Sequence, residues 1–280
     1  MGTILVPYDG SAGAKRALRY AREAYPDEKT VLLYVVELGT GAAGMPETAA
    51  QYYQTVMENA EELVAEAASD DELVTGEVTA GRPAHAILEF VAANDISHIV
   101  MGNRGRDGTA RVLLGSVAEA VVRRSPVPTT IVRKDSPERP ESVLVAFDGS
   151  EEAMGALEFA LSEYDAEVTA LFVVHPSQTL TERLFRRTEE TVDDWETERE
   201  ERTTEVFDAA SAIAEKQGKQ LTCEFREGEP AKQILSYLDE HPHDHVVAGS
   251  RGRDGVERIL FGSTAERIVR RAPVSVTVVR

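Results

Sequence analysis

The sequence predicts an α/β protein made of two similar halves, each a doubly wound, five-stranded parallel sheet with helices on both faces. In each half, short runs rich in β-branched residues, such as ILVPY, VLLYVV and HIVMG, alternate with stretches of helical periodicity. These runs are almost continuously apolar, which is typical of strands buried on both faces of a parallel sheet. The whole pattern then occurs a second time.

The repeat covers most of the chain and indicates two homologous domains in tandem. The first copy opens with TILVPYDGSAGAKRALRYA at 3–21, which matches SVLVAFDGSEEAMGALEFA at 142–160. A later segment, MGNRGRDGTARVLLGS at 101–116, matches AGSRGRDGVERILFGS at 248–263. A repeat of this length is far longer than the period of a solenoid. Because the charged, proline-containing RKDSPERPES lies between the copies, we expect domains over 1–134 and 142–280 with a linker over 135–141.

The same alternation predicts the individual elements of each half. In the first half we expect strands at 3–8, 30–36, 72–79, 97–101 and 127–133, with helices at 11–25, 46–69, 83–93 and 115–124. In the second half we expect strands at 142–147, 167–174, 221–227, 244–248 and 274–279, with helices at 151–164, 179–217, 230–240 and 262–271. The long helix at 179–217 is heavily charged, which fits a solvated face or an interaction surface.

Charge and composition narrow the classes of partner. The chain carries 49 Asp and Glu against 30 Lys and Arg, a formal net charge of −19 at pH 7. Nucleic acid and anionic membranes would repel such a surface, so neither is expected as the main partner. A single cysteine, Cys223, indicates a reducing compartment, and no apolar run approaches the ~20 residues of a membrane helix. We expect a soluble, cytoplasmic protein without a signal peptide.

Two loops in each half are predicted to face each other at one edge of the sheet. In open parallel sheets, ligands bind beyond the carboxyl ends of the strands, where the strand order reverses. One candidate loop follows the first strand and the other follows the fourth. The first holds Asp9, Gly10 and Ser11, repeated as Asp148, Gly149 and Ser150. The second holds Gly102, Arg104, Gly105, Gly115 and Ser116, repeated as Gly249, Arg251, Gly252, Gly262 and Ser263.

The residue types of the second loop suit a chain of phosphates. Glycine lets backbone N–H groups approach an anion and makes φ > 0 available at Gly102 and Gly105. Gly115 and Ser116 open a helix, whose free N–H groups and positive dipole end favour an anion. Arginines add positive charge to an otherwise acidic chain. They are Arg104, Arg106 and Arg111 in the first half, and Arg251, Arg253 and Arg258 in the second.

The aspartates suit a different part of a nucleotide. Asp9 or Asp148 would accept a hydrogen bond from a ribose hydroxyl or base N–H, or share a Mg²⁺ with the phosphates. Each feature also has a purely structural interpretation: a tight turn for Gly-x-x-Gly, a helix cap for Gly-Ser and Asp-Gly-Ser, and solvated charge for the arginines. The sequence leaves both interpretations open.

Two other kinds of site are disfavoured. His241, His243 and His245 suggest a metal site, but the chain has one cysteine and the first half has no matching cluster. No GxxxxGK(S/T) motif occurs, so a P-loop ATPase is not expected.

Taken together, these motifs resemble the universal stress protein family in its tandem, ATP-binding form. The family's Gly-x2-Gly-x9-Gly-(Ser/Thr) pattern stands here at 102–116 and again at 249–263. The resemblance implies a strand order of 3-2-1-4-5 and backbone contacts of adenine near Val35 and Val173. It also implies dimerisation through the last strand, here by pairing of Val127–Val132 with Val274–Val279, with a homodimer of the chain as a further possibility.

Three functional hypotheses remain open. The leading one is a regulatory stress-response protein that binds ATP, or AMP or ADP, without committed turnover. The second is a slow Mg-dependent ATPase or phosphotransferase, with Asp9 and Asp148 holding the metal ion. The third is an interaction scaffold whose pockets no longer bind nucleotide.

Overall fold

The fold is described from a computed structural model of the chain. It describes residues 2–37, 47–103, 114–133, 136–137, 139–174, 192–252 and 261–280. The chain consists of two compact units, unit 1 (Met1–Arg139) and unit 2 (Pro140–Arg280). Each is a parallel α/β unit, which confirms the predicted fold class and its tandem repetition.

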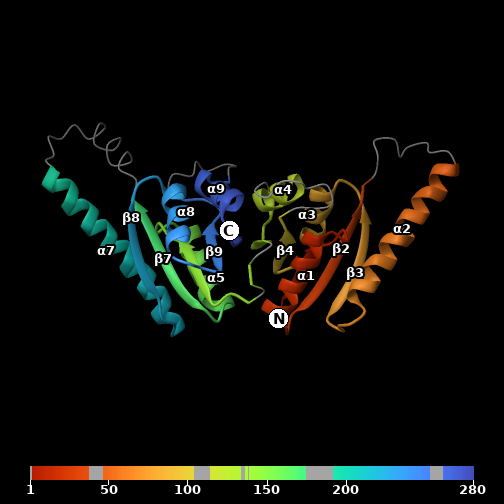
Figure 1. Cartoon of the computed structure of the whole chain (residues 1–280), viewed down its shortest axis with the longest axis horizontal. Coiled ribbons are helices and arrows are strands. Elements are labelled where there is room, and N and C mark those ends of the chain that lie inside the picture. The colour runs from red at the N-terminus through yellow and green to blue at the C-terminus, as the bar shows by residue number, and fades with distance from the viewer. Residues whose placement is uncertain are drawn as a thin grey trace. The chain divides into compact units, whose positions relative to one another are not determined.

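Unit 1 is a five-stranded parallel sheet flanked by helices (Figure 1). Its elements are β1 (Thr3–Pro7), α1 (Ala12–Ala24), β2 (Lys29–Val36), α2 (Glu47–Ala68), β3 (Val74–Ala80), α3 (Pro83–Ala93), β4 (His98–Gly102), α4 (Ser116–Arg124) and β5 (Thr129–Val132). Strand β1 pairs in parallel with both β2 and β4, β2 pairs with β3, and β4 pairs with β5. The order within the unit is therefore β3-β2-β1-β4-β5.

Unit 2 has the same arrangement. Its elements are β6 (Ser142–Ala146), α5 (Glu151–Glu163), β7 (Glu167–Val174), α7 (Val192–Gln217), β8 (Thr222–Glu227), α8 (Pro230–Glu240), β9 (His245–Gly249), α9 (Ser263–Arg271) and β10 (Ser275–Val279). The strand order is β8-β7-β6-β9-β10, which places β6 and β9 side by side as β1 and β4 are in unit 1.

In each unit, successive residues of the strands are buried on opposite faces of the sheet. In unit 1, Ile4, Val6 and Val100 pack with α1 and with Val64 of α2. Leu5 and Ile99, the intervening residues, are fully buried on the other face, where α3 and α4 contact each other. Burial on both faces explains the near-continuous apolar character of these strands.

Element ends differ from the predicted ones for local reasons. Strand β3 begins at Val74 rather than 72, because the N–H groups of Leu73 and Val74 both donate to Asp71 in a turn. Strand β5 begins after Pro128, which has no N–H to donate to a ladder. Of the helix expected at 179–217, the structure describes 192–217 as α7, and 175–191 lie outside the described residues. No described helix is long and apolar enough to cross a membrane.

Candidate functional site

The first predicted loop is a tight turn that leads directly into a helix in both units. Gly10 has φ of 77° and Gly149 has φ of 75°, a region that favours glycine. The carboxylate of Asp9 accepts the Ser11 N–H at 3.0 Å, and that of Asp148 accepts the Ser150 N–H at 2.9 Å. The two serines then cap α1 and α5, since each hydroxyl accepts an N–H of the first turn at 3.2 Å. The predicted cap is thus present.

The second predicted loop ends at a helix whose N-terminus has no side-chain cap. Gly115 is the N-cap of α4 and Gly262 that of α9, and neither helix start is closed by a side-chain hydrogen bond. Ser116 and Ser263 are therefore the first helical residues rather than caps. The Gly115 N–H donates to the Asn103 carbonyl at 2.8 Å, and the Gly262 N–H donates to Ser250 at the same distance. These bonds hold each helix start at the end of β4 or β9.

The glycines that end β4 and β9 are required by packing, which corrects one expectation. Neither Gly102 nor Gly249 has a positive φ. Instead, a Cβ on Gly102 would lie 2.6 Å from the carbonyl carbon of Gly13, and a Cβ on Gly249 would lie 2.8 Å from that of Glu152. Helix and strand approach so closely here that only hydrogen fits. This approach brings the first turn of α1 or α5 against the end of the neighbouring strand.

The structure brings the two loops together in unit 2. A Cβ on Gly252 would lie 2.7 Å from a carboxylate oxygen of Asp148. The aspartate after the first strand of unit 2 therefore lies beside the Gly-x-x-Gly segment, as the sheet order predicts. We use the word crevice for the region between these two loops of a unit. In unit 1 the corresponding residues, Arg104 and Gly105, lie outside the described residues, as do Arg106 and Arg111. Arg253 and Arg258 of unit 2 also lie outside them.

Val35 and Val173 lie at the same edge of their sheets. Val35 lies in β2 two residues beyond Leu33, which pairs with Pro7, the last residue of β1. Val173 lies near the end of β7, and both valines are half-buried.

One contact at the crevice was missed by sequence reasoning. The Arg251 guanidinium, 43% exposed, forms an ion pair with Glu152 of α5, with Nε 3.0 Å from Oε1. The residue matching Glu152 in unit 1 is Gly13. The pKa of Arg280 is lowered by burial and then by the charge of Arg251, so a second cation stands near this rim. The alignment of the two halves contains this difference, but an acidic residue in the first turn of a helix is ordinary and does not by itself indicate an ion pair.

The fold separates one histidine of the metal hypothesis, His245, from His241 and His243. His245 is fully buried, and its Nε2 lies 2.8 Å from the Thr277 hydroxyl and 3.2 Å from that of Tyr164. His243 is not buried and its Nδ1 lies 2.9 Å from the carbonyl of His241. In the part of the chain that the structure describes, no three His, Cys, Asp or Glu residues group as metal ligands.

Fold and loops together define a class: a tandem, doubly wound α/β protein in which glycines end the fourth strand and precede the following helix in each unit. The family model described as the universal stress protein family matches residues 1–133 and again residues 140–280. The chain belongs to the universal stress protein family, which confirms the resemblance found in its motifs.

Individual relatives support this membership over both halves. A universal stress protein of Methanocaldococcus jannaschii is 32% identical over 146 residues, covering 50% of this chain and 82% of the relative. A universal stress protein of Mycolicibacterium smegmatis is 26% identical over 298 residues, covering 99% of this chain and 96% of the relative. The crystal structure of a universal stress protein from Archaeoglobus fulgidus matches with a TM-score of 0.70 at 26% identity, covering 99% of this chain and 98% of that one.

Proposed function

We propose that this chain binds adenine nucleotide, ATP in the first place, in the crevice of each unit, and that it acts as a regulatory binding protein. One observation carries the proposal. Helices α4 and α9 begin at the crevice with no side-chain cap, whereas the neighbouring α1 and α5 are both capped by serine. Uncapped N–H groups at a positive dipole end are the groups that bind phosphate in α/β folds.

Each element that the two crevices share has a role in this proposal. The helix starts at Ser116 and Ser263 would hold phosphate oxygens through backbone N–H groups and the serine hydroxyls. Asp9 and Asp148 would accept from the ribose, and a Mg²⁺ would fit between such a carboxylate and phosphate oxygens, since Mg²⁺ is usually bound by one or two carboxylates together with phosphates. The backbone near Val35 and Val173 would contact adenine.

We favour regulation over turnover because the carboxylates described near the helix starts are already engaged in other contacts. Glu119 and Glu266, in the first turns of α4 and α9, pair with Arg123 and Arg270. Asp148 accepts a backbone N–H, and Glu152 pairs with Arg251. A residue positioned to activate water would be needed for fast hydrolysis. Pairing of the halves through Val127–Val132 and Val274–Val279, a homodimer, and a cytoplasmic role in stress response remain predictions.

The proposal is tested by melting the full chain across a range of ATP concentrations. At 100 times its Kd, one bound ligand adds about 2.7 kcal/mol of stability, so the melting temperature should rise steadily. In the variant Gly115→Val/Gly262→Val the shift should vanish. The φ values of −67° and −61° at these positions accept any residue, so the variant should fold.

The alternatives predict other results. A flat melting curve at millimolar ATP would support the scaffold hypothesis and contradict nucleotide binding. Steady-state phosphate release above that of the Gly115→Val/Gly262→Val variant would support the ATPase hypothesis.

A further inference from the structure

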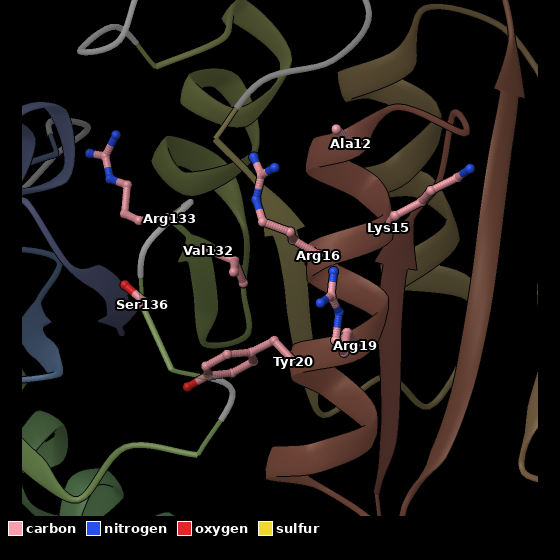
Figure 2. A pocket seen from close by; sticks show the side chains of 8 residues that line it. All are labelled: Ala12, Lys15, Arg16, Arg19, Tyr20, Val132, Arg133 and Ser136. Atoms are coloured by element: carbon pink, nitrogen blue, oxygen red, sulfur yellow. The ribbon is translucent and has the colours of Figure 1, made fainter.

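Each unit has a cavity outside its crevice, and the two cavities differ in charge. In unit 1 a cavity of about 330 Å³ opens between α1 and the end of β5, and Figure 2 shows Lys15, Arg16, Arg19 and Arg133 around it. Arg19 and Arg133 already have interaction partners. Unit 2 has a cavity of about 840 Å³, which is lined by three carboxylates, one lysine and a group of apolar residues. The second cavity is therefore the larger one, and its charge has the opposite sign.

The cavity of unit 2 lies at the amino edge of the sheet, opposite the edge that forms the crevice. Its lining residues come from the end of α5, from the starts of β7 and β8, and from the segments that precede β6, β7 and β8. Its volume lies within the range of about 300–1,000 Å³ usual for small-molecule sites. None of the residues predicted to bind nucleotide lines it. A ligand here would be separate from one in the crevice.

Comparison of the two units shows that this cavity does not follow from the repeated fold. In unit 1 the Nε of Arg22, in the last turn of α1, lies 3.0 Å from the Oδ2 of Asp71, in the turn before β3. This ion pair joins the helix to the turn. The matching residues of unit 2 are Leu161 and Gly218, which carry no charge. A Cβ on Gly218 would meet no atom within 4 Å, so the turn of unit 2 is open where unit 1 is bridged.

Part of the cavity wall is apolar. Leu161 is 1% exposed and Val168 is 4% exposed, and both belong to the core of unit 2. Leu221, partly buried, packs against the same core. An aliphatic chain that covers this wall gains free energy because apolar surface is removed from water. A hydrated ion such as Mg²⁺, which keeps several of its waters, would gain nothing from such a wall.

The cavity also carries an excess of negative charge. Glu141, Asp165 and Glu167 line it, and Lys219 is the cation among the lining residues. The Nζ of Lys219 lies 3.8 Å from the Oδ1 of Asp165. Glu141 and Glu167 take part in no ion pair among the described residues. Two carboxylates of the cavity are thus available to a cationic ligand.

These two glutamates are neighbours at the starts of two paired strands. The Glu167 N–H donates to the Glu141 carbonyl at 2.9 Å, and the Glu141 N–H donates to the Oδ2 of Asp244 at 2.9 Å, so both backbones are held in place. Like charges on neighbouring strands repel each other and destabilise a sheet. The matching residues of unit 1 are Gly2 and Lys29, so the repeated fold does not require the acidic pair. A bound cation would relieve the repulsion.

From these observations we infer that unit 2 contains a second ligand site, which binds an aliphatic diamine or polyamine at the amino edge of its sheet. Alkylammonium groups lose their proton only near pH ~10, and each offers three N–H donors. One ammonium group would meet Glu141 and another would meet Glu167, while the methylene chain between them covers the apolar wall. The net charge of −19 favours the approach of such a cation. The inference is independent of what the crevices bind.

The experiment is a calorimetric titration of 1,4-diaminobutane into the full chain at low ionic strength and without Mg²⁺. We expect one site per chain, with an affinity that falls as salt is added. The variant Glu141→Gln/Glu167→Gln keeps the shape of both side chains and should bind about tenfold more weakly. The control Glu205→Gln/Asp208→Asn removes the same charge from exposed positions of α7 and should stay within about twofold. Butylamine, with a single ammonium group, should bind more weakly than the diamine.

Four results would overturn the inference. They are no binding by the wild type at millimolar 1,4-diaminobutane, unchanged affinity in Glu141→Gln/Glu167→Gln, equal weakening in the control, and equal affinity for butylamine. The ATP-dependent melting shift of each variant is measured in parallel and should match that of the wild type, because the crevice lies at the other edge of the sheet. Loss of that shift in Glu141→Gln/Glu167→Gln alone would contradict a separate site. A wild type that binds the diamine but shows no ATP-dependent shift would support this inference and contradict the proposed function.

Discussion

Replacing Glu152 by glutamine should strengthen nucleotide binding at the crevice of unit 2. Glu152 forms a 3.0 Å ion pair with Arg251, the cation of the Gly-x-x-Gly segment. Unit 1 has Gly13 at the matching position, so no carboxylate stands there. Under the proposed function, phosphate must displace Glu152 from Arg251 in unit 2 and remain beside its negative charge.

The size of the effect follows from the exposure of the pair. The side chain of Glu152 is 22% exposed and that of Arg251 is 43% exposed, so solvent screens the pair and its loss costs ~0.2–1 kcal/mol. Repulsion between a carboxylate and one phosphate charge at about 6 Å adds roughly 0.7 kcal/mol in bulk water, and more in a less polar crevice. A total of about 1–2 kcal/mol corresponds to a five- to thirtyfold change in affinity.

The assay is a titration of ATP in a Gly115→Val background, which leaves only the crevice of unit 2. Glu152→Gln should tighten binding five- to thirtyfold. Glu151→Gln removes the same charge from an exposed position of the same helical turn and should change affinity less than threefold. Unchanged or weaker binding in Glu152→Gln, or equal tightening in Glu151→Gln, would refute the reasoning.

Two further predictions concern stability. Gly102→Ala places a Cβ 2.6 Å from the backbone of Gly13 and should lower the free energy of unfolding by about 1–3 kcal/mol in urea titrations. Gly155 lies in the interior of α5, where an added Cβ meets nothing within 4 Å, so Gly155→Ala should leave the free energy of unfolding unchanged or raise it by up to about 1 kcal/mol. An equal loss of unfolding free energy in both variants would contradict the packing argument. Burial lowers the pKa of His98 from 6.5 to about 3. The contribution of this neutral imidazole to the free energy of unfolding is therefore complete above pH 6.5 and is lost as the pH falls toward 3. Between pH 6 and pH 5, protonation of this residue in the unfolded chain should lower the free energy of unfolding by about 1.2 kcal/mol. The variant His98→Phe should lack this part of the pH dependence, and an unchanged pH dependence would contradict the burial of a neutral His98.

Sequence patterns predicted the architecture well because burial determined the residue types. Strands covered on both faces must be apolar throughout, so runs such as the one containing Leu5 and Val6 identify a parallel sheet without any structural information. The Asp-Gly-Ser turn was equally predictable, since a positive φ at Gly10 and a cap at Ser11 are local requirements.

Details that depend on distant contacts were not predictable. Gly102 is a glycine because α1 packs against it, and no feature of its own segment reveals that neighbour. The pairing of Glu152 with Arg251 joins positions about a hundred residues apart in the chain. His98, the first residue of β4, lies in the core with its Nε2 2.8 Å from the hydroxyl of Thr130 on the neighbouring strand. In each case the missing information is which elements become neighbours.

The central claim, that each crevice holds an adenine nucleotide, is tested most directly by the contents of the purified protein. The full chain is denatured, and the released small molecules are identified and counted per chain. Our account predicts an adenine nucleotide at up to two per chain, filled further on incubation with ATP and lost in Gly115→Val/Gly262→Val. A chain that releases none, and takes up none from millimolar ATP, would contradict it.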